Sequence, residues 1–257
     1  MKFIDTHSHL YSSKFDSDRT LIIKDAISSG VTKILLPNIS SKYTEGMLKV
    51  CNEFPKHCFP MMGLHPCDVN KNNIDNELTH VEQELAKRKY IAVGEIGLDL
   101  YWDKTKLEIQ KKAFIHQIEL AKKYNLPIAI HVRDSFTEAI EIIEKLNDER
   151  LSGVFHCFTG TIEEAEKVIK LGGFNLGIGG VLTFKNSGLD KTIEAIELKH
   201  LILETDAPYL APTPFRGKRN ESKYILNIAE KLAEVHEIDI KEVANITTSN
   251  AKKLFGL

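Results

Sequence analysis

The sequence has few cysteines, no long apolar segment and no excess of charge of either sign. Its four cysteines, Cys51, Cys58, Cys67 and Cys157, show neither the Cys-x-x-Cys spacing of a zinc knuckle nor the density of a secreted disulfide scaffold, so we expect reduced thiols. No apolar run approaches the ~18 residues of a membrane span, and polar residues 5–9 occupy the place of a signal peptide's apolar centre. These features predict a cytoplasmic protein with no membrane segment.

The charge balance narrows the classes of partner. A formal net charge of -2 excludes a protein that coats nucleic acid through a general positive field. Any nucleic acid would therefore have to bind a local basic patch. The 42% hydrophobic content over 257 residues is sufficient for a large core.

Short apolar runs alternate with amphipathic segments along the whole chain. The runs predict an opening strand from residue 3 and further strands at 32–36, 59–64, 90–94, 128–130, 154–155, 174–178 and 201–203. The intervening segments predict helices at 18–29, 41–54, 77–87, 106–124, 136–146, 162–171, 189–196 and beyond 224. Eight such units predict an α/β fold, a TIM-type (β/α)8 barrel. No linker or shift in composition interrupts residues 1–257, which predicts a single domain.

Side chains that bind metals follow most of the predicted strands. The opening run reaches His7 and His9, whose spacing aims both imidazoles at one point if the strand continues. The other strand ends carry, in order, His65, Glu95, His131, His156 and the pair Glu204 and Asp206. Each could instead be a hydrogen-bonded core histidine or a helix-capping carboxylate. One convergent site at the C-terminal face of the barrel explains all six strand ends with a single cause.

The number of these side chains indicates two ions. Together they exceed what one tetrahedral zinc uses, so we expect two divalent cations, Mg²⁺, Mn²⁺ or Zn²⁺. Glu95 is the expected bridge, because its run ends among glycines that let backbone and metal come close. Such a site hydrolyses phosphoesters or polarises a carbonyl group. No P-loop, nucleophilic Ser or Cys motif or dinucleotide-binding glycine motif competes with this interpretation.

Seven motifs follow one another along the chain: residues 3–9 (FIDTHSH), 63–66 (GLHP), 94–99 (GEIGLD), 131–133 (HVR), 156–160 (HCFTG), 204–210 (ETDAPYL) and 214–221 (PFRGKRNE). Together they resemble the motifs of the TatD family of metal-dependent hydrolases, in the family's order and over essentially the whole chain. The resemblance implies a TIM-type barrel, two divalent metals and deoxyribonuclease activity, often 3′ to 5′ on single strands. It also implies one ion held by His7, His9, Glu95 and Asp206 and another by Glu95, His131 and His156.

The chemistry of the remaining groups suggests catalytic roles. Asp206 can ligate a metal with one oxygen and accept a proton from water with the other, which makes it the preferred general base; its alternative role is ligand only. Glu204 shares the strand face of Asp206 and orients a ligand, unless it is a paired core carboxylate. His65 is expected to contact phosphate or donate a proton, with simple packing as the alternative.

Substrate contacts are expected in the loops that follow the strands. Arg133 suits bidentate phosphate binding, although a surface salt bridge would also explain it. Arg216 belongs to a basic cluster with Lys218 and Arg219. The aromatic side chains in these loops, on which bases could stack or which could simply pack, are Tyr101, Trp102, Phe158, Tyr209 and Phe215. Among them Tyr209 is expected to bind substrate.

The expected substrate is DNA, single-stranded or with frayed ends, and no obligate protein partner is expected. The ligands leave two other interpretations open. The same site could cleave an ester or amide bond, such as that of a D-aminoacyl-tRNA, because an activated water attacks phosphorus or carbonyl carbon alike. A metal-holding binding protein without turnover would be indicated by loss of a ligand or of Asp206, and none is lost.

Overall fold

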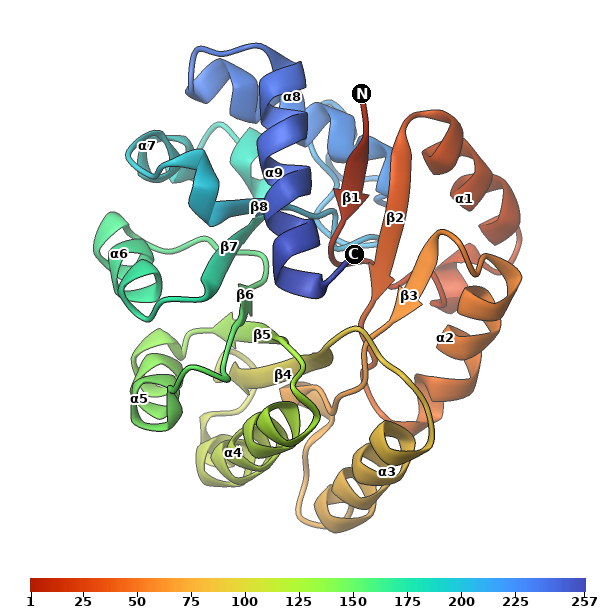
Figure 1. Cartoon of the computed structure of the whole chain (residues 1–257), viewed down its shortest axis with the longest axis vertical. Coiled ribbons are helices and arrows are strands. Elements are labelled where there is room, and N and C mark those ends of the chain that lie inside the picture. The colour runs from red at the N-terminus through yellow and green to blue at the C-terminus, as the bar shows by residue number, and fades with distance from the viewer.

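Eight parallel strands form a closed barrel surrounded by helices in the computed structural model, which describes all 257 residues (Figure 1). The strands are β1 (Phe3–Asp5), β2 (Val31–Leu36), β3 (Cys58–Pro60), β4 (Val93–Asp99), β5 (Ile128–Arg133), β6 (Gly153–Phe155), β7 (Phe174–Ile178) and β8 (Leu201–Leu203). The helices are α1 (Arg19–Ser28), α2 (Ser41–Glu53), α3 (Ile74–Lys87), α4 (Leu107–Tyr124), α5 (Phe136–Leu146), α6 (Ile162–Lys170), α7 (Leu189–Glu194), α8 (Ile225–Val235) and α9 (Ile240–Phe255).

Backbone pairing in chain order closes the barrel. Continuous parallel ladders join β1 to β3 and β4 to β8. The two gaps between these ladders are bridged by the pairs Met62 with Val93 and Ser8 with Ala207. Closure leaves no free strand edge, so the barrel predicted from the alternation of strands and helices is confirmed. Because all eight strands enclose one interior, we infer that residues 1–257 form one domain.

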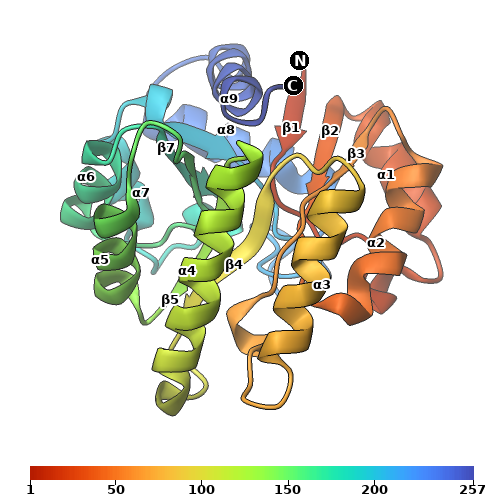
Figure 2. The same cartoon turned by 60° about the horizontal axis from the view of Figure 1, so that its bottom comes forward.

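Helix α9 covers the end of the barrel at which the strands begin (Figure 2). Its side chains Ala251 and Phe255 are buried with Ile4, Leu35 and Ile202, which come from β1, β2 and β8. This apolar cluster seals the N-terminal end. The opposite face, where the strands end, is therefore the end of the barrel at which a substrate can reach polar side chains.

Two buried glutamines of α4 fix the backbone beside that face. Gln117 Oε1 accepts from the Leu64 N–H at 2.7 Å, and its Nε2 donates to the Leu64 carbonyl at 3.2 Å. Gln110 binds Asp99 in the same two-sided way, at 2.9 and 3.0 Å. The side-chain amides thus substitute for strand pairing where two strand ends, those before His65 and at Asp99, leave the sheet.

The boundaries agree with the sequence prediction to within a few residues, except around β4. This strand was expected at 90–94 but lies at Val93–Asp99, so Glu95 lies inside the strand and not after its end. The strand continues because Ile96 and Leu98 are buried against the helices, which places Glu95 on the interior face. The expected strand at 59–64 pairs regularly only over Cys58–Pro60.

None of the helices combines the length and apolar character needed to cross a bilayer. All four cysteines are free thiols, as the sequence predicted. The cytoplasmic location stays a prediction.

Candidate active site

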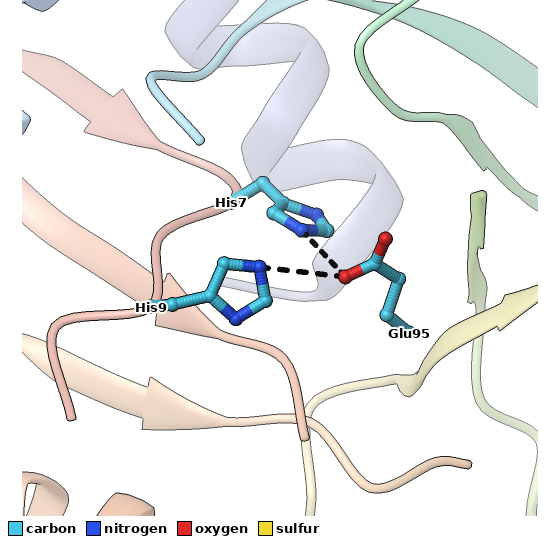
Figure 3. Close-up of side chains that lie close together, drawn as sticks. All are labelled: His7, His9 and Glu95. Carbon is cyan, nitrogen blue, oxygen red and sulfur yellow. Dashed lines mark hydrogen bonds and ion pairs between the residues drawn. The ribbon is translucent and has the colours of Figure 1, made fainter. Parts of the chain in front are cut away.

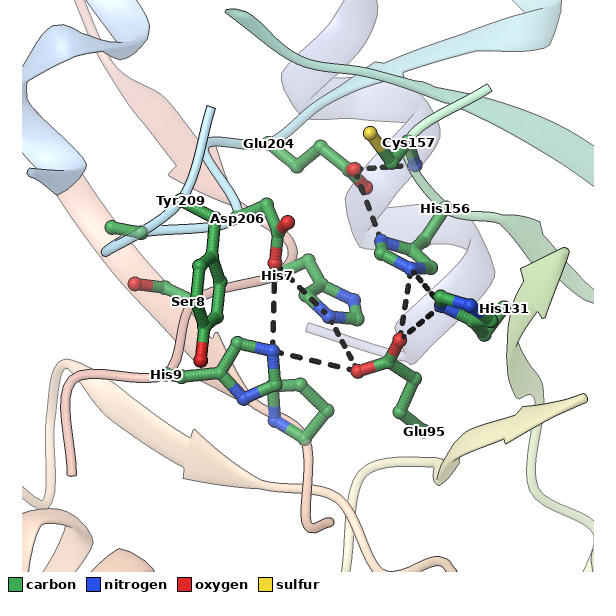
Figure 4. Close-up of polar contacts among 12 residues, drawn as sticks. His7, Ser8, His9, Glu95, His131, His156, Cys157, Glu204, Asp206 and Tyr209 are labelled. Atoms are coloured by element: carbon green, nitrogen blue, oxygen red, sulfur yellow. Dashed lines mark hydrogen bonds and ion pairs between the residues drawn. The ribbon is translucent and has the colours of Figure 1, made fainter. Parts of the chain in front are cut away.

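The carboxylate of Glu95 lies among five imidazoles at the open end of the barrel. Figure 3 shows it with His7 and His9, and Figure 4 adds His131 and His156. Its Oε2 is 3.1 Å from His7 Nε2 and 3.4 Å from His9 Nε2. Its Oε1 lies 2.9 Å from His131 Nδ1, 2.9 Å from His156 Nε2 and 3.1 Å from His65 Nε2. Each oxygen of one buried carboxylate therefore faces its own group of nitrogens.

Asp206, which follows β8, lies on the same side of Glu95 as the first pair of histidines. Its Oδ1 is 3.4 Å from His9 Nε2 and 3.8 Å from His7 Nε2, as Figure 4 shows. The side chains expected at one site thus come together from β4 and β5 and from the segments that follow β1, β3, β6 and β8.

Hydrogen bonds on the far side of the His9 and His131 rings set which nitrogen presents a lone pair to the site. Tyr11 donates its hydroxyl proton to the Pro37 carbonyl at 2.5 Å, so at 2.8 Å it accepts from Nδ1–H of His9. The lone pair of a neutral His9 is then on Nε2, which faces Glu95 and Asp206.

Two carboxylates orient the histidines on the other side. Asp99 Oδ2 lies 2.9 Å from His131 Nε2, so Nε2 carries the proton and Nδ1 presents its lone pair toward Glu95. Glu204 Oε1 lies 3.4 Å from His156 Nδ1 and also accepts from the Cys157 N–H at 2.5 Å. Asp99 and Glu204 thus stand in the positions of orienting groups, and the role suggested for Glu204 stays a prediction.

His65 is oriented the opposite way. Its Nδ1 accepts a hydrogen bond from the Cys67 N–H at 3.1 Å, so the proton is on Nε2, which faces Glu95. Burial lowers the pKa of His65, which keeps the ring neutral. His65 therefore presents an N–H donor to the site and not a lone pair, and its expected contact with phosphate stays a prediction.

The charges of the site favour bound cations. Burial opposes ionisation of Glu95, but the imidazoles of His65, His156 and His7 outweigh it and hold the pKa of Glu95 well below its usual value. Burial likewise opposes ionisation of Asp206, yet contact with His9 lowers the pKa of Asp206. Both carboxylates are ionised at neutral pH.

His9 and His7 respond differently to these carboxylates. Burial disfavours a charged His9, but hydrogen bonds to Asp206 and Glu95 raise its pKa to about 9. His7 stacks on His156 with ring centroids 3.9 Å apart, and burial followed by the charge of His156 lowers its pKa. In the absence of a cation, a protonated His9 thus supplies positive charge beside Asp206 and Glu95.

The donor set fits divalent cations. Ionised carboxylates and imidazoles whose lone pairs converge are the ligands that Zn²⁺ and related ions use. By distance, the residues form three overlapping groups of atoms within 4.8 Å of one another: His7, His9 and Glu95; His7, His156 and Asp206; and His65, Glu95 and His131. In the last group His65 faces the others with Nε2–H and not with a lone pair.

Two glycines allow the strands to approach closely here. Gly97 of β4 has φ of 142°, and a Cβ there would collide with the carbonyl of His131. A Cβ on Gly177 of β7 would collide with the carboxylate of Glu204. Both positions require glycine if His131 and Glu204 are to keep their places.

The residues expected to bind substrate differ in the side chains that they contact. Tyr209 is exposed, with its ring centroid 6.0 Å from that of His9. The guanidinium of Arg133 stacks on Tyr101, and that of Arg216 lies 4.3 Å from the centre of the Phe184 ring.

Arg219 departs from the expected basic cluster. Its guanidinium is bound by both oxygens of Asp18, at 2.8 and 2.7 Å, so its charge is engaged in a structural ion pair.

Comparison with known proteins identifies the family. A sequence model described as TatD related DNase matches residues 4–256. The chain belongs to the TatD family. Its membership confirms the resemblance of the seven motifs and makes this protein a metal-dependent hydrolase by family.

Several TatD-family relatives match this chain over nearly their whole length. An uncharacterized metal-dependent hydrolase, YabD of Bacillus subtilis, is 38% identical over 98% of both chains. The 3′-5′ ssDNA/RNA exonuclease TatD of Escherichia fergusonii is 32% identical, also over 98% of both. The crystal structure of YjjV, a TatD homologue from Escherichia coli, superposes with a TM-score of 0.92 at 30% identity, covering 99% of this chain and 98% of that one.

Three buried polar residues near the site had no assigned role in the sequence analysis. Asp99 lies in a quoted motif beyond the strand expected at 90–94, and Tyr11 lies two residues after His9. Asp5 accepts from the Thr205 N–H and hydroxyl at 2.9 and 2.6 Å, which ties β1 to the segment after β8. Burial raises the pKa of Asp5 to about 7. The available signal was a polar side chain two residues from a candidate ligand for Asp5 and Tyr11, and four residues after Glu95 for Asp99.

Proposed function

We propose that this TatD-family protein is a two-metal deoxyribonuclease that removes nucleotides from the 3′ ends of single-stranded or frayed DNA. The observation that carries the proposal is the position of Glu95, whose two oxygens face two separate groups of imidazoles. A bridging carboxylate of this kind is typical of two-metal hydrolases of phosphoesters. Relatives named as 3′-5′ ssDNA/RNA exonucleases, at 32% identity, support the choice of substrate.

The proposed ligands divide at Glu95. His7, His9 and Asp206 would hold one divalent cation with Glu95 Oε2, and His131 and His156 would hold the other with Glu95 Oε1. When bound, such cations act as Lewis acids and lower the pKa of water. The identity of the ions, Mg²⁺, Mn²⁺ or Zn²⁺, is part of what the experiment below tests.

Proton acceptance and phosphate contact fall to residues on opposite sides of the site. Asp206 is ionised and its side chain is 13% exposed, so it can accept a proton from the attacking water. His65 presents Nε2–H on a neutral ring and would donate a hydrogen bond to a phosphate oxygen or to the departing alkoxide oxygen, whose proton then comes from water. Glu204 acts through His156, whose ring it orients, and is therefore a positioning residue in this proposal.

Substrate binding rests on local charge because the chain as a whole carries a net charge of -2. Arg133 and Arg216 are exposed and suited to phosphate oxygens, and the ring of Tyr209 lies beside His9. Modest affinity for short single strands follows from so few contacts. The free thiols of the cysteines favour the cytoplasm as the place of action.

The test is hydrolysis of labelled oligonucleotides by protein loaded in turn with Mg²⁺, Mn²⁺ or Zn²⁺, with metal content measured in each preparation. We expect stepwise shortening of a 5′-labelled single strand, slower shortening of a blunt duplex, and no activity in EDTA. The variant Glu95→Gln should lose activity. The control Asp16→Asn, which changes an exposed carboxylate just before α1, should retain it.

The same panel includes an aminoacyl ester. Cleavage of the ester by metal-loaded protein that leaves every oligonucleotide intact would assign the site to carbonyl chemistry and overturn the nuclease proposal. Metal-loaded protein that cleaves neither substrate class would also overturn it.

A further inference from the structure

Two large aromatic side chains lie exposed in the loop between β4 and α4. Tyr101 is 52% exposed and Trp102 is 72% exposed, although burial of either ring would stabilise the fold. The two rings meet edge to face, with centroids 4.9 Å apart and planes at 89°. They therefore brace each other and leave the indole open to solvent.

Arg133, at the end of β5, completes this group. Its guanidinium carbon lies 3.6 Å from the centre of the Tyr101 ring and 5.6 Å from that of Trp102. Stacking on Tyr101 fixes the plane of the guanidinium while its N–H groups remain available for an anion. We call Tyr101, Trp102 and Arg133 the aromatic platform.

The aromatic platform is joined to the candidate active site through Asp99. The Tyr101 N–H donates to Asp99 Oδ1 at 3.1 Å, and Asp99 Oδ2 binds His131 Nε2 at 2.9 Å. Arg133 lies opposite Asp99 in the backbone register of the β4–β5 ladder. One carboxylate thus sets both the orientation of His131 and the place where the loop carrying the aromatic rings begins.

Two lysines and one aspartate follow Trp102 in the loop. Lys104 and Lys106 follow it in the chain, and Lys104 is exposed. The acidic neighbour Asp103 is engaged by the Thr105 N–H and hydroxyl, at 2.9 and 2.6 Å. An exposed aromatic ring flanked by cations suits a ligand that combines flat apolar faces with negative charge.

We propose that the aromatic platform binds an unpaired nucleobase of the substrate, with the base stacked on Trp102 and the neighbouring phosphate on Arg133. This inference rests on the proposed nuclease function and adds a base-binding subsite to it. Every nucleobase has a π-face, so the subsite is tolerant of sequence. A base within a duplex already stacks on its neighbours, and the platform therefore favours single strands and frayed ends.

Trp102 is the one tryptophan of the chain, so its fluorescence reports directly on stacking. The first experiment titrates EDTA-treated protein with an oligothymidylate and with the same strand carrying abasic sites. We expect saturable quenching by the first and little by the second. Equal quenching by both, or none, would overturn the stacking.

The second experiment measures binding of a labelled single strand by Trp102→Ala, Trp102→Phe and the control Leu21→Ala, whose apolar side chain is exposed on α1. We expect about tenfold weaker binding for Trp102→Ala, most of the affinity restored by phenylalanine, and no change for the control. In metal-loaded protein KM for single strands should rise more than kcat falls.

The two proposals fail separately. Quenching by single strands in a protein that shortens no oligonucleotide with any cation would refute hydrolysis and leave the subsite standing. Wild-type binding and KM in Trp102→Ala would refute the subsite and leave hydrolysis standing.

Discussion

Replacing Asp99 by asparagine tests how the candidate site is organised. In the protein, Asp99 Oδ1 accepts from the Tyr101 N–H at 3.1 Å and Oδ2 faces His131 Nε2 at 2.9 Å. The oxygen of an asparagine would stay with the Tyr101 N–H, which turns the amide NH₂ toward His131. Nε2 must then accept, so the ring proton moves to Nδ1.

The moved proton occupies the position proposed for a cation. His131 Nδ1 lies 2.9 Å from Glu95 Oε1, so a proton there removes one lone pair from the second cation site. Loss of an orienting partner of a metal-binding histidine typically weakens metal binding 10–100-fold, or about 1.4–2.7 kcal/mol. We expect Asp99→Asn to lower affinity for one of two cations by about this factor.

The assay is competition for Mn²⁺ or Zn²⁺ with a chromophoric chelator, combined with oligonucleotide hydrolysis at saturating and limiting metal. The matched control is Asp103→Asn, because Asp103 lies on the same loop and binds only Thr105. Unchanged affinity for both cations in Asp99→Asn, with a fold as stable as the wild type in EDTA, would refute the assignment of His131 Nδ1 as a ligand.

Three further predictions concern Asp206 and His9 in the candidate active site and Phe255 in the apolar seal. Asp206→Asn should keep much of its metal and lose about 10²–10⁴ in kcat, since the proton acceptor is gone; near-normal kcat at full metal loading would contradict the general-base role. Adding metal to EDTA-treated protein at pH 7.5 should release protons, because the pKa of His9, raised to about 9, keeps its ring protonated until a cation displaces the proton. A pH indicator in weak buffer would detect these protons. Metal binding without proton release would argue against His9 as a ligand. Phe255→Ala, at the apolar seal of α9, should lower the free energy of unfolding by about 3–5 kcal/mol with kcat unchanged in the folded protein, as urea denaturation and initial rates would show.

Much of the fold could be predicted from the sequence because the barrel repeats one simple unit. Each apolar run predicted a strand, and the polar residue after it marked the open end. Six strand ends therefore indicated a site before any contact was known. The position of Glu95 was predicted less well, since β4 continues to Asp99 and apolar content alone does not mark where a strand ends inside a barrel.

The sequence by itself determined which side chains are able to hold a metal and that they lie at one end of a barrel. The tertiary structure decided which nitrogen of each ring faces the site. Tyr11 and Asp99 set this for His9 and His131, while the Cys67 N–H turns His65 into a donor.

The tertiary structure also separated the arginines, holding Arg219 against Asp18, 201 residues away in the chain, and leaving Arg133 on the ring of Tyr101. The physical reason is the same for the rings and the arginines. Strand periodicity fixes the face on which a side chain lies, whereas its protonation and its partner depend on atoms brought within about 3 Å by closure of the barrel.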